Sequence, residues 1–299
     1  MIRNFIDIKN FKKKQIDEII SLAKKIKKNP KKFSNSCKNK TLGLIFEKQS
    51  LRTRLSFNVG MQKLGGSVLE LNSKDIGFDN KRETAKDVIN ILAQFIDCIM
   101  IRNNNHKQIL TLSEQNVIPV INGLTEYSHP CQILGDFLTI QEKFKNYKKI
   151  QITWIGDFNN VLRSLLHLQN IYKFKLNVVT PVKILKSYLK EIKLYENEKL
   201  IFLSNPIQGS FGSKCIMTDV WVSMGEKNKN KLNLFKNFTV DKNIIDKADK
   251  DVIFMHCLPA KRGQEVTSQV LDGKNSVVLD QAKNRMFIQQ AILLYVLSN

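Results

Sequence analysis

Cationic and hydroxyl side chains are concentrated within residues 46–57, FEKQSLRTRLSF. Ser50, Arg52, Thr53 and Arg54 follow the apolar run TLGLIF, which is typical of a buried strand, and precede a helical pattern. The first turn of a helix has free N–H donors and a partial positive charge, so it attracts anions. Guanidinium and hydroxyl groups at that corner predict a site for a tetrahedral dianion, although a capped helix with surface arginines would leave the same pattern.

The elements around this corner alternate between apolar strands and amphipathic helices. Such alternation indicates a parallel sheet that helices cover on both faces. In the first half of the chain we expect helices near 12–28, 53–64, 84–95 and 106–116, and strands near 41–46, 67–71, 97–101 and 117–121.

A second alternating series follows a long helix expected at 130–144. Its strands are expected near 149–155, 175–179, 215–221 and 252–255, and a last helix, 281–297, could pack back on the first half. The fold class is therefore predicted as α/β, with two doubly wound parallel-sheet domains. We expect one domain at 1–142 with the C-terminal helix 281–299, a second at 143–280, and an active-site cleft between them.

Composition favours a globular cytoplasmic protein. The 299 residues are 42% hydrophobic, with no uninterrupted apolar run of transmembrane length and no evident secretory signal at the start. An odd number of scattered cysteines without a C-x-x-C pair predicts reduced thiols and argues against a disulfide framework or a zinc site. These are Cys37, Cys98, Cys131, Cys215 and Cys257.

The net charge of +21 raises the alternative of nucleic-acid binding. Residues 1–40 hold 13 Lys and Arg against 3 Asp and Glu, a net of +10. However, the lysines flank isoleucines at the spacing of an amphipathic helix, and no aromatic residue is interleaved to stack a base. We interpret them as a solvated helix face, and expect neither a specific nucleic-acid partner nor a membrane partner.

Six segments in order resemble motifs of the aspartate/ornithine carbamoyltransferase family. FEKQSLRTRLSF resembles its carbamoyl-phosphate loop, usually Ser-Thr-Arg-Thr-Arg. The resemblance extends from about residue 40 to 292, and several motifs in one order are far more specific than any of them alone. The others are MIR (100–102), HPCQILGD (129–136), DVWVSMG (219–225), HCLPAKRGQEV (256–266) and AKNRMF (282–287).

The resemblance implies transfer of a carbamoyl group from carbamoyl phosphate to an amine, without a metal or a cofactor. It gives catalytic roles to Arg102, His129 and Cys257. Thr53, Arg102 and His129 occupy the family's positions for donors where the carbonyl oxygen becomes negative, and Cys257 would lie near the attacking amine and help to select its neutral form. Arg54 is expected to pair with nearby carboxylates instead. The implied carbamoyl-phosphate residues are Ser50, Leu51, Arg52, Thr53, Arg102, His129, Gln132, Cys257, Leu258 and Arg285.

The second-half motifs are similar to those of the ornithine-specific members. Their match implies that Asp219 holds the α-ammonium of L-ornithine, that Cys257 lies near its side-chain amine, and that the remaining contacts come from Asn160, Ser223 and Met224. The product would be L-citrulline for arginine biosynthesis. The family also implies a homotrimer or a multiple of trimers.

Two residues differ from the family motif, and they leave a different amine possible as the substrate. Leu51 stands where the family usually has threonine, and Gln49 where it often has proline. Leucine at this place also occurs in relatives that use N-acylated ornithine, so that substrate, putrescine and lysine remain alternatives. Residues 79–89 also depart from the family pattern, and we assign no ligand there.

Overall fold

The chain divides into two compact α/β units, as the alternation of strands and helices predicts. The structure is a computed structural model that describes residues 2–47, 50–72, 83–222 and 229–298. Unit 1 comprises residues 1–138 and 283–299, and unit 2 comprises residues 139–282. The expected boundaries were 142/143 and 280/281; the structural division lies at 138/139 and 282/283, inside helices α5 and α12.

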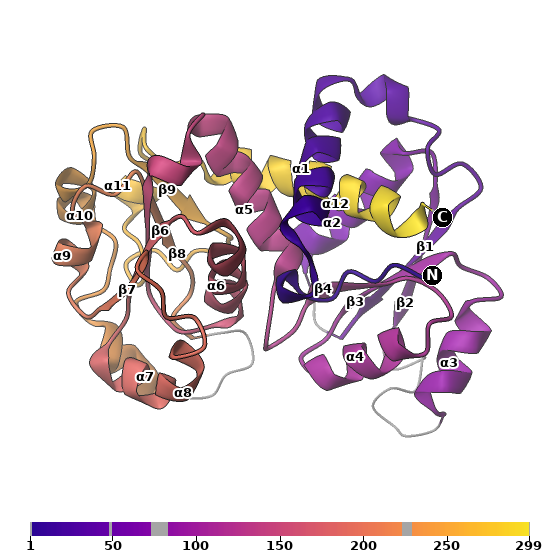
Figure 1. Ribbon diagram of the computed structural model, residues 1–299, viewed down its shortest axis with the longest axis horizontal. Helices are drawn as coiled ribbons and strands as arrows, with labels where there is room; N and C mark the ends of the chain where they lie inside the picture. The colour runs from indigo at the N-terminus through magenta and orange to yellow at the C-terminus, as the bar shows by residue number, and fades with distance from the viewer. Residues whose placement is uncertain (1, 48–49, 73–82, 223–228, 299) are drawn as a thin grey trace. The chain divides into compact units, whose positions relative to one another are not determined.

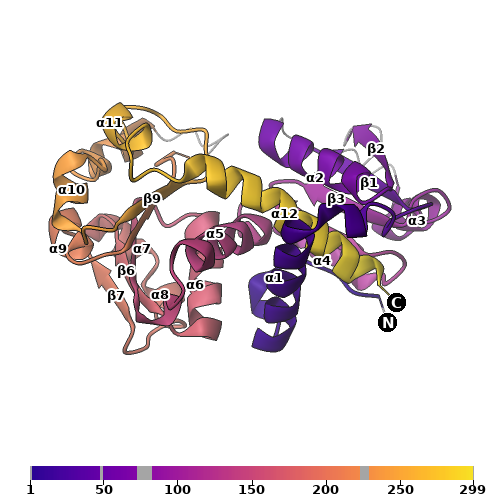
Figure 2. The same ribbon diagram turned by 90° about the horizontal axis from the view of Figure 1, so that it is seen from above.

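Unit 1 is built on a parallel sheet of four strands in its described residues, in the order β2-β1-β3-β4. Helices α1, α2 and the later part of α12 lie on one face, and α3 and α4 lie on the other (Figure 1 and Figure 2). Its elements are α1 (Lys13–Lys28), β1 (Thr41–Phe46), α2 (Leu51–Lys63), β2 (Ser67–Asn72), α3 (Ala85–Leu92), β3 (Cys98–Arg102), α4 (His106–Glu114), β4 (Val120–Leu124), α5 (Pro130–Lys143) and α12 (Val278–Leu297).

Unit 2 contains a parallel sheet of five strands, again counted over described residues, in the order β7-β6-β5-β8-β9. Helix α9 packs on one face and α6 lies on the other (Figure 1). Its elements are β5 (Gln151–Ile155), α6 (Asn160–Tyr172), β6 (Lys175–Val179), α7 (Val182–Ser187), α8 (Leu189–Ile192), β7 (Leu200–Leu203), α9 (Pro206–Ser210), β8 (Cys215–Thr218), α10 (Lys242–Lys247), β9 (Ile253–His256) and α11 (Ser268–Leu271).

Helix α1 forms as its periodicity predicts. A single apolar stripe is buried, the lysines around it are mostly exposed, and the helix ends two residues before Pro30. Each buried isoleucine contributes about 1.5–3 kcal/mol relative to an exposed one. The stripe consists of Ile16, Ile19, Ile20, Ala23 and Ile26.

The edge of the unit 1 sheet differs from the prediction. Strand β4 begins at Val120, whereas the apolar run VIPVI predicted a strand over 117–121. The strand continues through Asn122 to Leu124, and a segment at the N-terminus pairs beside it. Phe5 forms a parallel bridge with Ile121, and its backbone N–H donates to the Val120 carbonyl at 2.8 Å.

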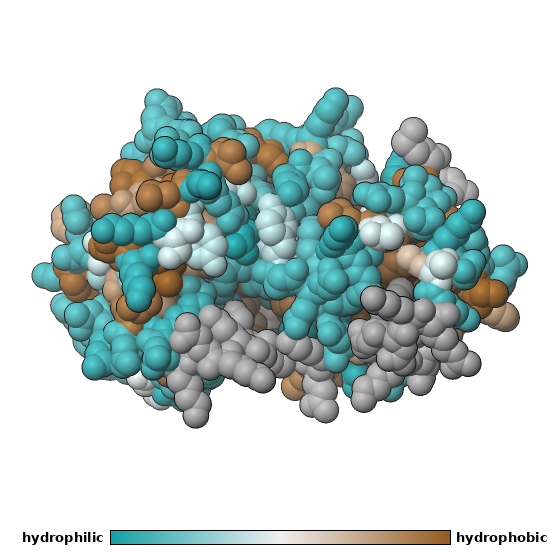
Figure 3. Space-filling model, turned by 90° about the horizontal axis from the view of Figure 1, so that it is seen from below, coloured by the Kyte–Doolittle hydropathy of each residue, from teal (hydrophilic) through white to brown (hydrophobic). Residues whose placement is uncertain are grey.

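The face drawn in Figure 3 is mainly hydrophilic, with smaller hydrophobic areas among the polar residues. Among the described residues, no helix combines the length and the apolar composition needed to cross a membrane.

Candidate active site

The corner for which the sequence predicts an anion site is the N-terminus of α2. Ser50 is the N-cap residue, and its Oγ accepts a hydrogen bond from the backbone N–H of Thr53 at 3.4 Å. The first turn carries no acidic side chain that would neutralise the helix dipole. The side chain of Leu51 is 69% exposed, so the part of this residue suited to bind an anion is its backbone N–H.

Two guanidinium groups meet at the hydroxyl of Thr53. Arg102, at the end of β3, donates from Nη1 to Thr53 Oγ1 at 2.9 Å. Arg285, from α12, donates from Nη2 to the same oxygen and from Nη1 to Oε1 of Gln132 at 2.9 Å. Four residues predicted from separate motifs are thus brought together in unit 1. The arrangement concentrates positive charge beside the N-terminus of α2, as a bound phosphate requires.

Helix α12 reaches this position because its neighbour α5 has a small residue at the contact. A Cβ on Gly135 would lie 3.1 Å from the Cα of Arg285, so a larger side chain there would push the helices apart. Next to Arg285, the Oδ1 of Asn284 accepts a hydrogen bond from Lys27 Nζ of α1 at 2.7 Å. These contacts fix where the guanidinium group of Arg285 points.

His129 lies beside the same cationic group and is only 3% exposed. Burial, and then the positive charges of Arg285, Arg102 and Arg52, hold the pKa of His129 well below its ordinary value. The imidazole is therefore neutral at physiological pH. A neutral imidazole can donate a hydrogen bond to a carbonyl oxygen without adding charge to the pocket.

The pH dependence of stability should report this depressed pKa. The unfolded chain takes up a proton on His129 near pH 6.5 and the folded chain does not. Above that pH the imidazole is neutral in both states and adds no pH dependence, whereas below it proton uptake by the unfolded chain lowers the stability, by up to about 1.4 kcal/mol per pH unit. Urea unfolding at several pH values should show a shallower decline in the variant His129→Gln; equal slopes would contradict the assignment.

The remaining arginines of the loop differ in their surroundings. Arg52 is half-buried, and its charge lowers the pKa of His129. Arg54 points to the edge strand instead, where its Nε lies 3.4 Å from the Glu70 carboxylate and its guanidinium group lies 4.9 Å from the centre of the Phe46 ring. Arg54 thus pairs with a carboxylate, as expected from the sequence.

In unit 2 a carboxylate follows the carboxyl end of β8. The Oδ2 of Asp219 accepts a hydrogen bond from Asn159 Nδ2 at 2.8 Å, and its Oδ1 accepts one from Cys257 Sγ at 3.0 Å. Asp219 is 7% exposed. The predicted neighbour Asn160 is the first residue of α6. Ser223 and Met224 lie outside the described residues.

Sequence reasoning missed Asn159, which orients Asp219. Its Oδ1 accepts the N–H groups of Val161 and Leu162 at 3.0 Å each, so it caps α6. This leaves its Nδ2 directed at Asp219. The signal was present as an asparagine directly before a helical pattern, a common N-cap arrangement.

His256 and Glu265 were also missed, although they lie within a quoted motif. His256 Nδ1 accepts the backbone N–H of Leu258 at 2.8 Å, so the ring proton is assigned to Nε2, which lies 3.2 Å from Glu265 Oε1. Both side chains are buried. Leu258 has a left-handed backbone, with φ of 56°, and this pair supports the turn that presents Cys257 and Leu258.

Asp219, His256 and Cys257 each offer one potential metal-ligand atom, all within 4.8 Å of one another. In the structure these three side chains form hydrogen bonds with one another or with nearby residues of the same chain, as described above. A metal ion here would have to displace those hydrogen bonds.

The fold and the two groups of site residues match one enzyme family. Residues 3–142 match the family description "Aspartate/ornithine carbamoyltransferase, carbamoyl-P binding domain", and residues 148–296 match "Aspartate/ornithine carbamoyltransferase, Asp/Orn binding domain". The class is thus that of the carbamoyltransferases. The chain belongs to the aspartate/ornithine carbamoyltransferase family.

Similar proteins and solved structures within this family are named ornithine carbamoyltransferases. The ornithine carbamoyltransferase of Rhodopseudomonas palustris strain CGA009 is 40% identical, over 99% of this chain and 97% of that protein. The solved ornithine carbamoyltransferase from Pyrococcus furiosus has a TM-score of 0.90 and 38% identity, over 97% of this chain and 96% of the other. The enzyme from Thermus thermophilus has a TM-score of 0.88 and 32% identity, over 99% of both chains.

Proposed function

We propose that the protein transfers the carbamoyl group of carbamoyl phosphate to the side-chain amine of L-ornithine, giving L-citrulline and phosphate. The observation that carries the proposal is the meeting of Arg102 and Arg285 at Thr53, beside the N-terminus of α2. Family membership and the names of the similar proteins support the same reaction. We assign the citrulline to arginine biosynthesis.

The unit 1 residues would bind carbamoyl phosphate by two kinds of contact. Free N–H donors and fixed cations suit the phosphate, and we assign this part to the start of α2. Gln132, whose Oε1 already accepts from Arg285, is suited to orient the carbamoyl amide. The proposed phosphate contacts are Ser50, the backbone of Leu51, Arg52 and Thr53; the proposed carbamoyl contacts are Arg102, His129, Gln132, Arg285 and the carbonyls of Cys257 and Leu258.

Catalysis would rest on donors aimed at the oxygen that gains charge. The lone pair of the ornithine amine attacks the carbonyl carbon, the carbonyl oxygen becomes negative, and the bond to the phosphate oxygen then breaks. Arg102 and neutral His129 would stabilise that oxygen. The amine must lose a proton, and we place Cys257, whose thiol touches Asp219, near that step.

Ornithine binding is assigned to unit 2 because Asp219 is a buried carboxylate with a fixed direction. An α-ammonium group can pair with this carboxylate, while Asn160 supplies a neutral amide for the α-carboxylate. Ser223 and Met224 keep their assignment from the sequence. Putrescine lacks the carboxylate, and an N-acylated ornithine lacks the charged α-amine, so neither would use the whole set.

A panel of amines tests the reaction. We expect carbamoyl phosphate to give a ureido product with ornithine, and little with N-acetylornithine, putrescine, lysine or aspartate. Ureido product and released phosphate should be measured together, because carbamoyl phosphate also decomposes by itself. Turnover of another amine alone would keep the phosphate assignments and refute the assignment of Asp219. No turnover with any amine would refute the proposal, unless Leu51→Thr restores it.

We further propose a homotrimer, or a multiple of trimers, in the cytoplasm. Strand β2 is the edge of the described unit 1 sheet, and exposed edges invite pairing with another chain. Leu55 on α2 is 52% exposed and Leu69 on β2 is 43% exposed, which suits a surface covered by a neighbouring copy. The five free thiols suit a reducing compartment.

Sedimentation tests the assembly. We expect a mass three times the 34.5 kDa of the single chain, or a multiple of that. Leu69→Glu should dissociate it, because a charge would be buried in the contact. Leu279→Glu is the matched control, since this leucine is 77% exposed in unit 2. A fully active monomer would refute the proposal.

The alternative of nucleic-acid binding has a separate test. The described residues of α1 place their lysines around a buried stripe, as a solvated face does. We expect weak binding to duplex DNA that disappears near 0.2 M salt. Binding that persists at that salt concentration would make nucleic acid a partner.

A further inference from the structure

The loop that presents His129 contains buried polar side chains that have no part in the proposed chemistry. Thr125 and Ser128 lie between the end of β4 and the start of α5, and Asn122 lies within β4 just before them; all three are fully buried. Buried polar groups are costly unless their hydrogen bonds are made. Three of them within a few residues of a proposed catalytic group therefore call for a physical reason.

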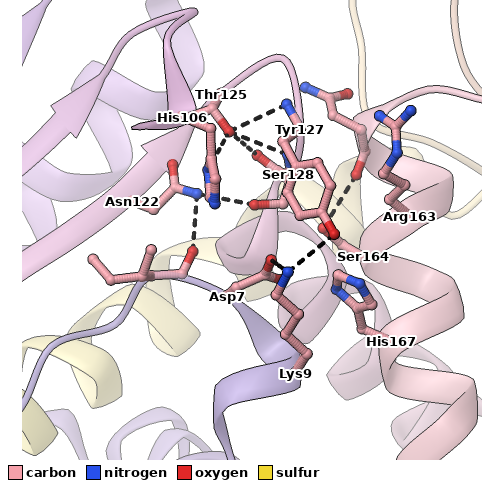
Figure 4. A network of polar contacts seen from close by, with 12 residues as sticks. Asp7, Lys9, His106, Asn122, Thr125, Tyr127, Ser128, Arg163, Ser164 and His167 are labelled. Carbon is pink, nitrogen blue, oxygen red and sulfur yellow. Dashed lines mark hydrogen bonds and ion pairs between the residues drawn. The ribbon is translucent and has the colours of Figure 1, made fainter. Parts of the chain in front are cut away.

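Thr125 closes the loop on itself. Its backbone N–H donates to the carbonyl of Ser128 at 2.9 Å, and its Oγ1 accepts the N–H groups of Ser128 and Tyr127 at 3.2 and 3.3 Å. The same oxygen lies 3.0 Å from Nδ1 of His106, the first residue of α4 (Figure 4). One hydroxyl thus sets the backbone direction of the residues that lead into His129.

Ser128 is held from the opposite side. Asn122 donates from Nδ2 to Ser128 Oγ at 3.1 Å and to the carbonyl of Ile6 at 2.9 Å (Figure 4). The Sγ of Cys131, on the first turn of α5, donates to the Asn122 carbonyl at 3.4 Å. The residues immediately before and shortly after His129 are therefore tied to the same asparagine.

The N-terminal segment completes this support. It runs parallel to β4, where the backbone N–H of Asn122 donates to the carbonyl of Phe5 at 2.8 Å. Lys9 continues the segment to the loop, with Nζ 3.0 Å from the Tyr127 hydroxyl and 4.5 Å from the centre of its ring (Figure 4). The segment and the loop thus form one connected network in unit 1.

We propose that Thr125 and Ser128 are positioning residues for His129, an inference that rests on the proposed carbamoyl transfer. Pro130 follows His129 directly, and the His129 carbonyl accepts the N–H groups of Gln132 and Ile133 at 3.2 and 3.3 Å. The helix fixes His129 from its C-terminal side. The two hydroxyls fix it from the N-terminal side, so the backbone that carries the imidazole is held on both sides.

The first test removes a hydroxyl without changing the shape of the side chain. Thr125→Val should lower kcat for citrulline formation about 10- to 100-fold, because small misplacement of a catalytic group has effects of this size. The KM for carbamoyl phosphate should change by less than about threefold, and Thr125→Ser should keep most of the activity. Thr111→Val is the matched control, since that hydroxyl donates to the Lys107 carbonyl of its own helix, at 3.1 Å, and to no other group among the described residues.

A double-mutant cycle separates positioning from general damage. In a His129→Ala background, Thr125→Val should cost almost nothing further, because the group that it positions is gone. The full loss in that background, or an unchanged kcat in the single variant, would overturn the proposal. If Thr125→Val does not fold, Ser128→Ala replaces it, with the same expected result in both backgrounds.

A measurement without turnover keeps this inference separate from the proposed function. The sequence has only 4 histidines, so NMR signals of the His129 ring can be assigned by comparison with His129→Gln. Thr125→Val or Ser128→Ala should shift these signals, whereas Thr111→Val should not. If the wild-type protein forms no citrulline, the proposed function fails while this comparison still decides the positioning role; unchanged ring signals would refute it.

Discussion

Arg285→Met is expected to lower kcat for carbamoyl transfer about a hundred- to a thousandfold. Arg285 is 3% exposed and donates to both Thr53 and Gln132, so it holds the phosphate end and the carbamoyl end of the proposed substrate site. Losing one preorganised donor at developing charge has effects of this size. The variant should remain folded, since methionine fills much of the space and removes a buried charge. Steady-state kinetics and thermal unfolding would measure both outcomes.

The same variant has a second readout at His129. After burial, the positive charge of Arg285 contributes most to lowering the pKa of this imidazole. Its removal should therefore raise that pKa, which NMR titration can follow. Arg262→Met is the control, because this exposed arginine of unit 2 pairs with Asp272. An Arg285→Met enzyme with normal kcat would refute the role given to α12.

Asp219→Asn is expected to raise the KM for ornithine about a hundredfold. The substitution keeps the shape of the side chain, and so the contacts with Asn159 and Cys257 can partly remain, but it removes the negative charge that would pair with the α-ammonium. Hydrogen bonds to charged groups contribute about 1.5–3 kcal/mol, which corresponds to a loss of this order. The KM for carbamoyl phosphate should change little.

The matched control is Asp251→Asn, which removes a carboxylate whose side chain is 62% exposed and lies 3.3 Å from Lys214. Initial rates at varied ornithine and saturating carbamoyl phosphate would compare the two variants. Equal ornithine KM values would show that Asp219 does not bind the α-ammonium. A loss in kcat alone would place Asp219 in the proton transfer instead.

Most of the fold could be predicted because it depends on local periodicity. The buried stripe of α1 and the apolar run of β1 appear in the sequence as they do in the structure. Two parts could not be predicted. Strand β4 extends through buried Asn122, whose Nδ2 donates to the carbonyl of Ile6, 116 residues away in the sequence, and polarity alone argues against such a strand. Strand β7 is a short edge strand with Ile201 half-exposed, so its pattern is weak.

The candidate site was predictable where its groups are adjacent in the chain. Ser50, Arg52 and Thr53 occupy one corner, and their types alone indicate an anion. The meeting of Arg285 with Thr53 joins residues 232 positions apart, and only the resemblance to known enzymes suggested it. Asn159 was missed because a capping side chain and a ligand side chain look alike in sequence. Its neighbour Asn160 was chosen instead, and that assignment stays a prediction.

The division of unit 1 into residues 1–138 and 283–299 has a consequence for protein synthesis. Unit 2 is one continuous segment, so it can fold on the ribosome as soon as that segment has emerged. Unit 1 begins first but lacks the later part of α12 until translation has passed unit 2. Arg285, which that helix supplies, is among the last site residues to be made. A nascent chain stalled within unit 2 would therefore carry the N-terminus of α2 without the buried Arg285, and would gain the proposed activity only after the later part of α12 has been made.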